Sequence, residues 1–178
     1  MAISLIPVVD SDLELYKYDM QEAFQRGYED VLGPTNEVIL PEEDIDCSLN
    51  TAGAAAYHAV LDGERVGGAI VVIDPVTQKN HLDFLFVKHG VQSKGIGSSI
   101  WREIEVRYPE TKVWITCTPY FEKRNIHFYV NRCGFHIVAF FNERFPDHHM
   151  PNDYMENDYM EKDPSEGMFL FEKRMEPS

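Results

Sequence analysis

Short apolar runs recur along the chain and indicate a protein rich in β-strands. Gly, Pro or acidic residues bound these runs, and β-branched and aromatic side chains are concentrated within them, which is typical of strands. The predicted strands are residues 3–9, 54–61, 65–73, 81–87, 113–117, 135–140 and 168–171. Asp62-Gly63 lies between the second and third runs and suits the positive φ angles of a tight turn, so these two strands should form an antiparallel hairpin.

Helical periodicity appears in three places between the strands. The first predicted helix spans residues 11–27, where Ser11 and Glu14 form a capping-box pattern. Two more helices are predicted, one after residue 95 and one over residues 120–132. The order strand, helix, hairpin, then strand–helix–strand–helix–strand predicts an α/β protein with a mixed sheet, in which the strand–helix–strand pieces supply parallel pairs.

Length and composition favour a single soluble domain over residues 1–178 with a sizeable core, since 44% of the residues are hydrophobic. No apolar run reaches the ~18 residues that a membrane span needs, and the start MAISLIPVVD lacks the basic region of a signal peptide. Cys47, Cys117 and Cys133 show neither zinc-finger nor redox spacing. We therefore expect reduced thiols in a cytoplasmic protein.

The chain is strongly acidic, with a formal net charge of −14. This charge argues against nucleic acid as a partner, because phosphate backbones need basic surfaces. Acidic residues gather in the loop-like stretch 28–50, which has room for a short helix, and in residues 142–166, where NDYME occurs twice in succession. Residues 142–166 are expected to form an insertion before the last strand, either simply solvated or acting as a lid or a dimer contact.

Residues 91–101, VQSKGIGSSIW, join the strand 81–87 to the following helix. A loop that runs into a helix ends where several N–H groups have no intrahelical partner and the helix dipole is positive. Gly95 and Gly97 let the backbone approach an anion closely, and Gln92 and Lys94 add donors. The pattern predicts a phosphate-binding loop.

Two well-known nucleotide-binding loops share glycines with this one but differ at their functional residues. A dinucleotide-binding fingerprint would need glycine where Ile100 stands. A Walker A loop would need Lys and then Ser or Thr after Gly95, where Ile96 and Gly97 stand.

The sequence Gln92-x-x-Gly95-x-Gly97 does resemble the Gln/Arg-x-x-Gly-x-Gly/Ala signature of the GNAT superfamily, the acetyl-CoA-dependent N-acetyltransferases. Residues 125–135, NIHFYVNRCGF, resemble the segment of that family that carries Asn, Phe-Tyr and Gly-Phe. The resemblance covers roughly residues 1–140, with residues 78–140 as its specific core. Ser93, where the family often has glycine, and the segment 142–166 depart from it.

The resemblance implies an α/β (α+β) fold, in which helices flank a mixed, mostly antiparallel sheet that is splayed between its fourth and fifth strands, 81–87 and 113–117. The pantetheine arm of acetyl-CoA would lie in the splay, and its diphosphate would lie on the loop. By resemblance, the residues that bind the cofactor are Phe86, Val87, Gln92, Ser93, Lys94, Gly95, Ile96, Gly97, Ser98, Asn125 and Phe128. Core packing alone is the other explanation for Phe128.

By resemblance, the reaction moves the acetyl group of acetyl-CoA to a primary amine of a small molecule or peptide, by direct attack in a ternary complex. Tyr129 occupies the position where many members place the tyrosine that protonates the CoA sulfur, although a packed aromatic would look the same.

The amine must also lose a proton to a general base. His81 lies where histone-type members carry a catalytic glutamate, and Asp83 is two residues further along the same strand, so both should share one face. Other members work through ordered water without one indispensable base. We predict no metal site, because the adjacent His148 and His149 lack metal-ligand spacing.

The acceptor would enter between residues 28–44 and 141–166, and both stretches are acidic. This favours a cationic acceptor such as a polyamine, an aminoglycoside or a basic peptide N-terminus, although the same acids could simply keep the protein soluble. A homodimer is a further expectation from the resemblance. The alternative functions are a non-catalytic CoA-binding regulatory module and a partner-binding domain that uses the NDYME repeat.

Overall fold

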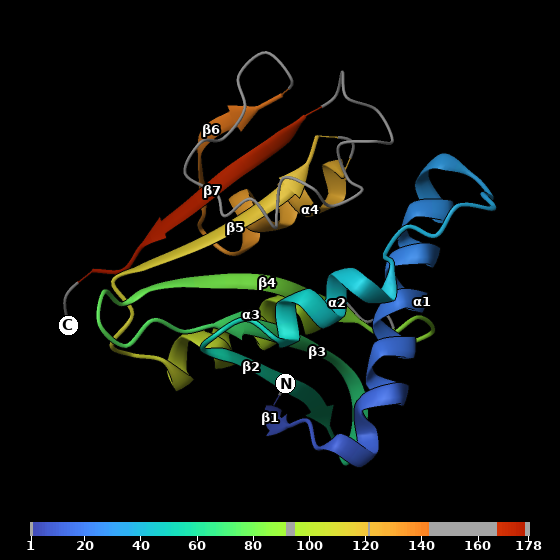
Figure 1. Ribbon diagram of the computed structural model, residues 1–178, viewed down its shortest axis with the longest axis horizontal. Coiled ribbons are helices and arrows are strands. Elements are labelled where there is room, and N and C mark those ends of the chain that lie inside the picture. Colours follow the sequence, from blue (N-terminus) through green and yellow to red (C-terminus); the bar gives the residue numbers. More distant parts are fainter. Residues whose placement is uncertain (1, 92–94, 121, 143–166, 177–178) are drawn as a thin grey trace. The chain divides into compact units, whose positions relative to one another are not determined.

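The computed structural model describes residues 2–91, 95–120, 122–142 and 167–176. These residues belong to two compact units, Met1–Lys112 and Val113–Ser178 (Figure 1). The single-domain organisation stays a prediction. Most of the predicted insertion 142–166, including both NDYME copies, lies outside the described residues.

The first unit is a four-stranded antiparallel sheet with helices on both faces. Its elements are β1 (Ile3–Pro7), η1 (Asp10–Asp12), α1 (Leu13–Leu32), α2 (Glu42–Leu49), β2 (Ala54–Leu61), β3 (Glu64–Val72), β4 (Lys79–Val87) and α3 (Ile96–Arg107). The strands pair in the order β1-β2-β3-β4. Asp62 (φ 51°) and Gly63 (φ 82°) both adopt positive φ between β2 and β3, so the predicted hairpin is confirmed.

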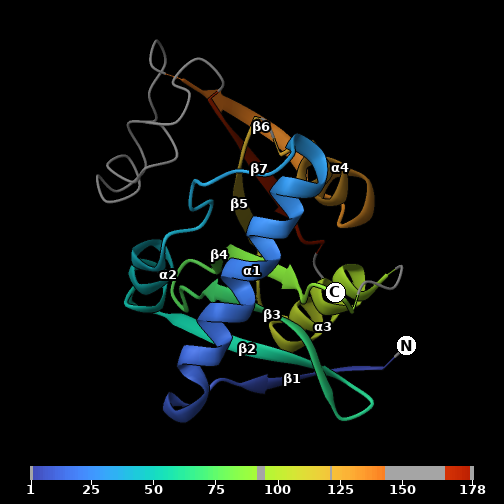
Figure 2. The same ribbon diagram turned by 90° about the vertical axis from the view of Figure 1, so that its right-hand side faces the viewer.

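Two adjacent glycines in β3 let helices approach the sheet from opposite sides. A β-carbon on Gly68 would lie 2.8 Å from Tyr16 Cε2 of α1, and one on Gly67 would lie 3.2 Å from Ile100 Cδ1 of α3. Neighbouring residues of a strand point to opposite faces, so α1 and α3 cover opposite faces of this sheet (Figure 2). Tyr16 and Ile100 are almost fully buried, and they mark the two halves of the core.

The start of α1 differs from the prediction, because the Ser11–Glu14 capping box does not form. The chain enters the helix through the 3₁₀ turn η1, whose backbone already satisfies the first donors: Asp12 N bonds Val9 O at 2.9 Å, and Leu13 N bonds Asp10 O. No side chain caps either element. The helix also runs to Leu32, five residues beyond its predicted end at residue 27.

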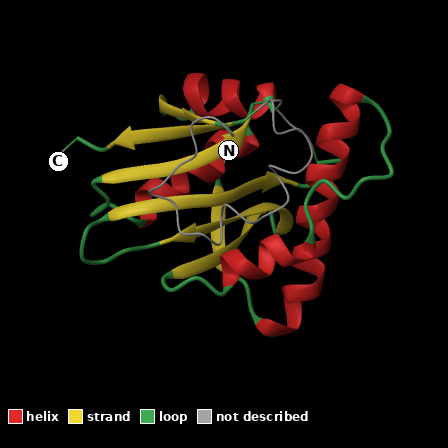
Figure 3. Ribbon diagram, turned by 45° about the horizontal axis from the view of Figure 1, so that its top comes forward, coloured by secondary structure: helices red, strands yellow, loops and turns green. Residues whose placement is uncertain are grey.

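α1 and α2 lie side by side and are joined by an ion-pair network (Figure 3). The Nζ of Lys17, a buried residue of α1, lies 2.6 Å from Asp46 Oδ1 and 3.1 Å from Glu42 Oε1 of α2. The side chain of Ile45, between them, is fully buried. α2 is therefore a fixed part of the unit, and it accounts for the short helix expected within residues 28–50.

The second unit contains β5 (Val113–Pro119), α4 (Lys123–His127), the π-helical turn η2 (Phe128–Arg132), β6 (His136–Phe141) and β7 (Met168–Arg174). β7 lies between β5 and β6 and is antiparallel to both. The expectation that β5 and β6 would form a parallel pair is therefore wrong, because the last strand takes the place between them. Phe171 of β7 is fully buried there.

The predicted fold class, α/β with a mostly antiparallel sheet flanked by helices, is confirmed. The splay between the strands 81–87 and 113–117 stays a prediction.

Candidate functional site

The N-terminus of α3 follows a glycine turn and exposes backbone donors. Gly95 takes the N-cap position with φ 99°, and the first helical hydrogen bond runs from Ser99 N to Gly95 O at 2.9 Å. The N–H groups of the three preceding residues, 96–98, therefore have no carbonyl to bond within the helix. The first turn holds no acidic residue, so nothing there opposes an anion.

This helix start has room for a phosphate. Among the described residues, none has an atom within 4 Å of a β-carbon placed on Gly95, and Gly95 itself is exposed. The side chain of Ile96 is buried in the core and anchors this end of the helix. The arrangement fits a diphosphate approached by main-chain N–H groups. Gln92, Ser93 and Lys94, which were predicted to assist, lie outside the described residues.

β4 carries a β-bulge at Asp83. Its register with β3 passes from Phe84 opposite Ile70 directly to Leu82 opposite Val71, so Asp83 is the extra residue. Bulges redirect side chains and are frequent beside active sites. Nothing in the local sequence predicts the bulge at Asp83.

The bulge decides where the candidate bases point. His81 is opposite Val72 and Phe84 is opposite Ile70, and because those β3 partners are two residues apart they share a face. Phe84 packs edge-on against Phe24 of α1, with ring centroids 6.0 Å apart, so His81 also lies on the α1 side of the sheet. The strict alternation used in the sequence prediction would have placed Phe84 and His81 on opposite faces.

Asp83 and His81 have different surroundings. The Asp83 carboxylate accepts a hydrogen bond from the hydroxyl of Ser48 in α2, with Oγ and Oδ2 2.6 Å apart. Burial lowers the pKa of His81, and the Asp83 carboxylate partly raises it again. The imidazole is therefore mostly neutral at pH 7 and can accept a proton. Sequence reasoning missed Ser48, because nothing in the sequence links α2 to β4.

Phe86 and Val87, the predicted partners of the pantetheine arm, end β4 opposite Gly68 and Gly67. The Phe86 ring is buried and packs edge-on against Tyr16 at 5.5 Å between centroids. Its side chain therefore belongs to the core, which leaves only its main chain for the predicted role.

Tyr129 of the second unit lies in the π-helical turn η2. The residue is 6% exposed, and its ring contacts the rings of Phe128, Phe135 and Phe171 at 5.5–5.7 Å between centroids. Such turns are rare and frequently occur at functional sites. Here the extra residue closes a Cys133 N to Phe128 O bond of 3.0 Å.

The Tyr129 phenol is held in its neutral form. Burial raises its pKa most, the nearby Cys133 raises it further, and a hydrogen bond with the Thr116 side chain lowers it in part. A neutral phenol is a proton donor, as the predicted role requires. Thr116 is another residue that sequence reasoning missed. Asn125 and Phe128, the predicted cofactor contacts, are both half-buried nearby on α4 and η2.

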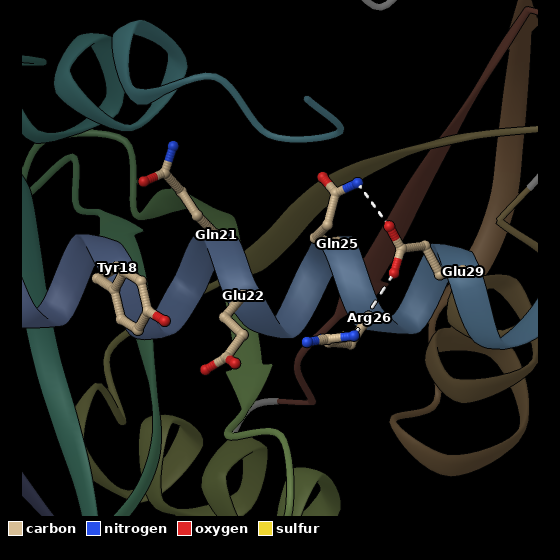
Figure 4. A pocket seen from close by; sticks show the side chains of 6 residues that line it. All are labelled: Tyr18, Gln21, Glu22, Gln25, Arg26 and Glu29. Atoms are coloured by element: carbon tan, nitrogen blue, oxygen red, sulfur yellow. Dashed lines mark hydrogen bonds and ion pairs between the residues drawn. The ribbon is translucent and has the colours of Figure 1, made fainter. Parts of the chain in front are cut away.

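A shallow hollow on α1 is lined mainly by polar side chains, and two of them bond the main chain of a neighbouring segment (Figure 4). Gln25 Nε2 donates to Glu37 O at 2.9 Å, and Gln25 Oε1 accepts from Ile39 N at 3.0 Å. Gln21 Nε2 adds a bond of 3.1 Å to Leu40 O. These side chains fasten the segment 37–40 onto the helix.

Several acids that were predicted to attract a cationic acceptor are occupied within the first unit. Glu29 bonds Gln25 at 3.1 Å and lies 3.8 Å from Arg26 (Figure 4), while Glu42 is paired with Lys17. Among the described residues, no group of three or more His, Cys, Asp or Glu side chains could hold a metal ion. Of the helices in those ranges, none has both the length and the apolar character needed to span a membrane. All three cysteines are described and carry free thiols.

The chain resembles known proteins in both sequence and structure. The model of the acetyltransferase (GNAT) family matches residues 16–135. The protein YrkN of Bacillus subtilis (strain 168) is 46% identical over 142 residues, which are 79% of this chain and 77% of YrkN.

Solved structures with low sequence identity share the fold. The ribosomal-protein-S18-alanine N-acetyltransferase from Escherichia coli is 11% identical, with a TM-score of 0.68 over 99% of this chain and 96% of that one. A GNAT family acetyltransferase from Elizabethkingia anophelis, solved with acetyl-CoA bound, is 16% identical, with a TM-score of 0.65 over 97% of this chain and 98% of that one. The family match spans well over half of the sequence, and the chain therefore belongs to the acetyltransferase (GNAT) family.

Proposed function

We propose that this protein is an N-acetyltransferase that moves the acetyl group of acetyl-CoA to a primary amine by direct attack in a ternary complex. The observation that carries this proposal is the start of α3, where Gly95 (φ 99°) leaves a helix N-terminus open to an anion directly after β4. Because the chain belongs to the GNAT family, we expect this anion to be the diphosphate of CoA.

The main-chain N–H groups of Ile96, Gly97 and Ser98 would hold the diphosphate, with Gln92, Ser93 and Lys94 beside them. Phe86 and Val87 would offer main-chain groups to the pantetheine arm, and Asn125 and Phe128 would line its other side. When bound, acetyl-CoA supplies an activated thioester carbonyl. The remaining chemistry belongs to the protein.

The first protein contribution is removal of a proton from the amine. An alkylamine with a pKa near 10.4 lies about 3.4 pH units above neutrality, so deprotonation at pH 7 costs ~4.6 kcal/mol. His81 suits this task because burial lowers its pKa and keeps it neutral, while Asp83 would stabilise the imidazolium that forms.

The second contribution is a proton for the departing sulfur. The pKa of Tyr129 is raised by burial, so its phenol keeps a proton at any physiological pH and can donate it. Thr116 would hold the hydroxyl in place through the hydrogen bond that the two side chains share.

We further propose an acceptor with positive charge, a cytoplasmic location and a homodimer. The pairing of the acids supports the first point: Glu29 and Glu42 pair with Arg26 and Lys17 of the same unit, whereas Asp30 and Glu43 of the stretch 28–44 are exposed. Acetylation rates for mono-, di- and polyamines at two salt concentrations test it, because only a charged acceptor should respond to salt.

The central experiment combines calorimetry with an acceptor panel. We expect the purified protein to bind acetyl-CoA and to release free thiol with at least one primary amine. Failure to bind CoA or acetyl-CoA at millimolar ligand would overturn the assignment. Binding without turnover across a broad amine panel would instead favour a non-catalytic CoA-binding module.

A further inference from the structure

Ser48 is a buried serine on α2 whose hydroxyl reaches across to β4. Only 4% of the residue is exposed, and its Oγ donates to Asp83 Oδ2 at 2.6 Å. That distance lies in the range of strong hydrogen bonds between a hydroxyl and an ionised carboxylate. The bond joins residues 35 positions apart in the sequence, so it connects two separate elements of the first unit.

The carboxylate that Ser48 bonds belongs to the extra residue of the β4 bulge. At a bulge the regular ladder is interrupted, so the direction of this side chain depends on what holds it from outside the strand. Ser48 is itself held firmly. α2 is fixed by the pairing of Lys17 with Asp46 and Glu42 and by the fully buried Ile45.

We infer that Ser48 is a positioning residue for proton removal from the acceptor amine, acting through Asp83 on His81. The inference rests on the proposed acetyltransferase function. One proton leaves the amine nitrogen and one imidazole nitrogen of His81 accepts it. The Asp83 carboxylate, fixed by Ser48, stabilises the resulting imidazolium, and the proton later passes to solvent. Ser48 is not a nucleophile here, because its hydroxyl proton is directed to a carboxylate and not to a base that could remove it.

Kinetics of three substitutions test this role. Ser48→Ala should lower kcat about 10- to 100-fold while leaving the KM for acetyl-CoA unchanged, since the hydrogen bond that is lost is made to a carboxylate that is not assigned to cofactor binding. Ser48→Thr keeps a hydroxyl and should restore most of kcat. Ser48→Cys has nearly the size of serine but is a weak donor, so it should behave like alanine even if threonine proves too large for the buried position.

Thr51→Val is the matched control. Thr51 lies just beyond the end of α2, and its hydroxyl donates to Cys47 O at 2.9 Å. This substitution removes a hydroxyl beside the same helix without touching β4, so kcat should stay within twofold of the wild type. Ser48→Ala combined with Asp83→Asn should be no slower than Asp83→Asn alone, because Ser48 acts through that carboxylate.

A second readout does not depend on turnover. NMR titration of His81 should show a lower pKa in Ser48→Ala than in the wild type and no such change in Ser48→Thr, because an Asp83 carboxylate without the Ser48 hydrogen bond is less well directed and supports the imidazolium less well. Other charged groups on the packed helices, Lys17 of α1 and Asp44 and Asp46 of α2, remain in every variant.

The kcat values and the His81 titration together distinguish a failure of the positioning role from a failure of the proposed function. If the wild type acetylates an amine but Ser48→Ala keeps both its kcat and its His81 titration, the positioning role is wrong. If no amine is acetylated but the His81 titration responds as expected, the coupling between Ser48, Asp83 and His81 stands while the proposed function falls. A loss of kcat in Ser48→Ala that is absent from Ser48→Cys, which also lacks a strong donor, likewise overturns the role.

Discussion

Gly95→Ala tests whether the α3 N-terminus contributes to CoA binding. Gly95 has φ 99°, a left-handed conformation that disfavours a side chain, but a β-carbon there would meet no atom of the described residues within 4 Å. The cost to folding is therefore backbone strain without a clash. This strain is about 1–2 kcal/mol, and it is partly offset by the lower entropy of the unfolded chain. The melting temperature should fall by only about 2–4 °C.

The effect on binding should be larger. The new methyl group would stand where an anion approaches residues 96–98, and a hydrogen bond to a charged group contributes about 1.5–3 kcal/mol. We expect the Kd for CoA to rise about 10- to 100-fold in calorimetry. 3′-Dephospho-CoA, which keeps the diphosphate, should lose affinity by the same factor.

Gly63→Ala is the control for this prediction. Gly63 also has positive φ (82°) and open space around its missing β-carbon, but it lies in the β2–β3 hairpin turn. It should show a similar fall in melting temperature and an unchanged Kd. Equal CoA affinities in the two variants, both folded, would refute the assignment of the diphosphate to the start of α3.

Three further predictions concern catalysis and stability. Tyr129→Phe should lower kcat at least 100-fold without changing CoA affinity in calorimetry, because only the proton donor is lost; wild-type turnover would exclude Tyr129 as the acid. Activity should rise with pH through a pKa below 6.5, because burial lowers the pKa of His81 and favours its neutral form. Asp83→Asn should move this acid limb to lower pH, since the carboxylate raises that pKa; a shift to higher pH would contradict the pairing. Gly68→Ala should lower the free energy of unfolding by about 1–3 kcal/mol in urea titrations, because the added carbon meets Tyr16, Phe86 and the backbone of β2. A wild-type midpoint would show that α1 can move away from the sheet.

The parts of the fold that follow local rules were predictable from the sequence. The Asp62-Gly63 hairpin formed as expected, because its turn conformation is encoded by those two residues. The glycine turn into α3 could be predicted for the same reason. The capping box did not form, and the carbonyls of Val9 and Asp10 accept from the N–H groups of Asp12 and Leu13 instead.

Other features depend on pairings between distant residues. The place of β7 between β5 and β6 is a choice among strand orders that the apolar run 168–171 does not specify. The bulge at Asp83 arises from the register with β3, and the Ser48–Asp83 bond spans two elements. Sequence analysis therefore proposed His81 and Asp83 as bases but could not find the serine that orients one of them.

The hydrogen bonds from Gln21 and Gln25 to the main chain of residues 37–40 also matter for redesign. The two glutamine side chains bond the backbone of this segment, as a neighbouring strand would. The bonds hold the path of the segment, and the buried side chains of Ile39 and Leu40 fix it in the core. Residues 33–36, which precede the anchored stretch, are a candidate insertion point, because the bonds to residues 37–40 would keep the path of the chain that follows.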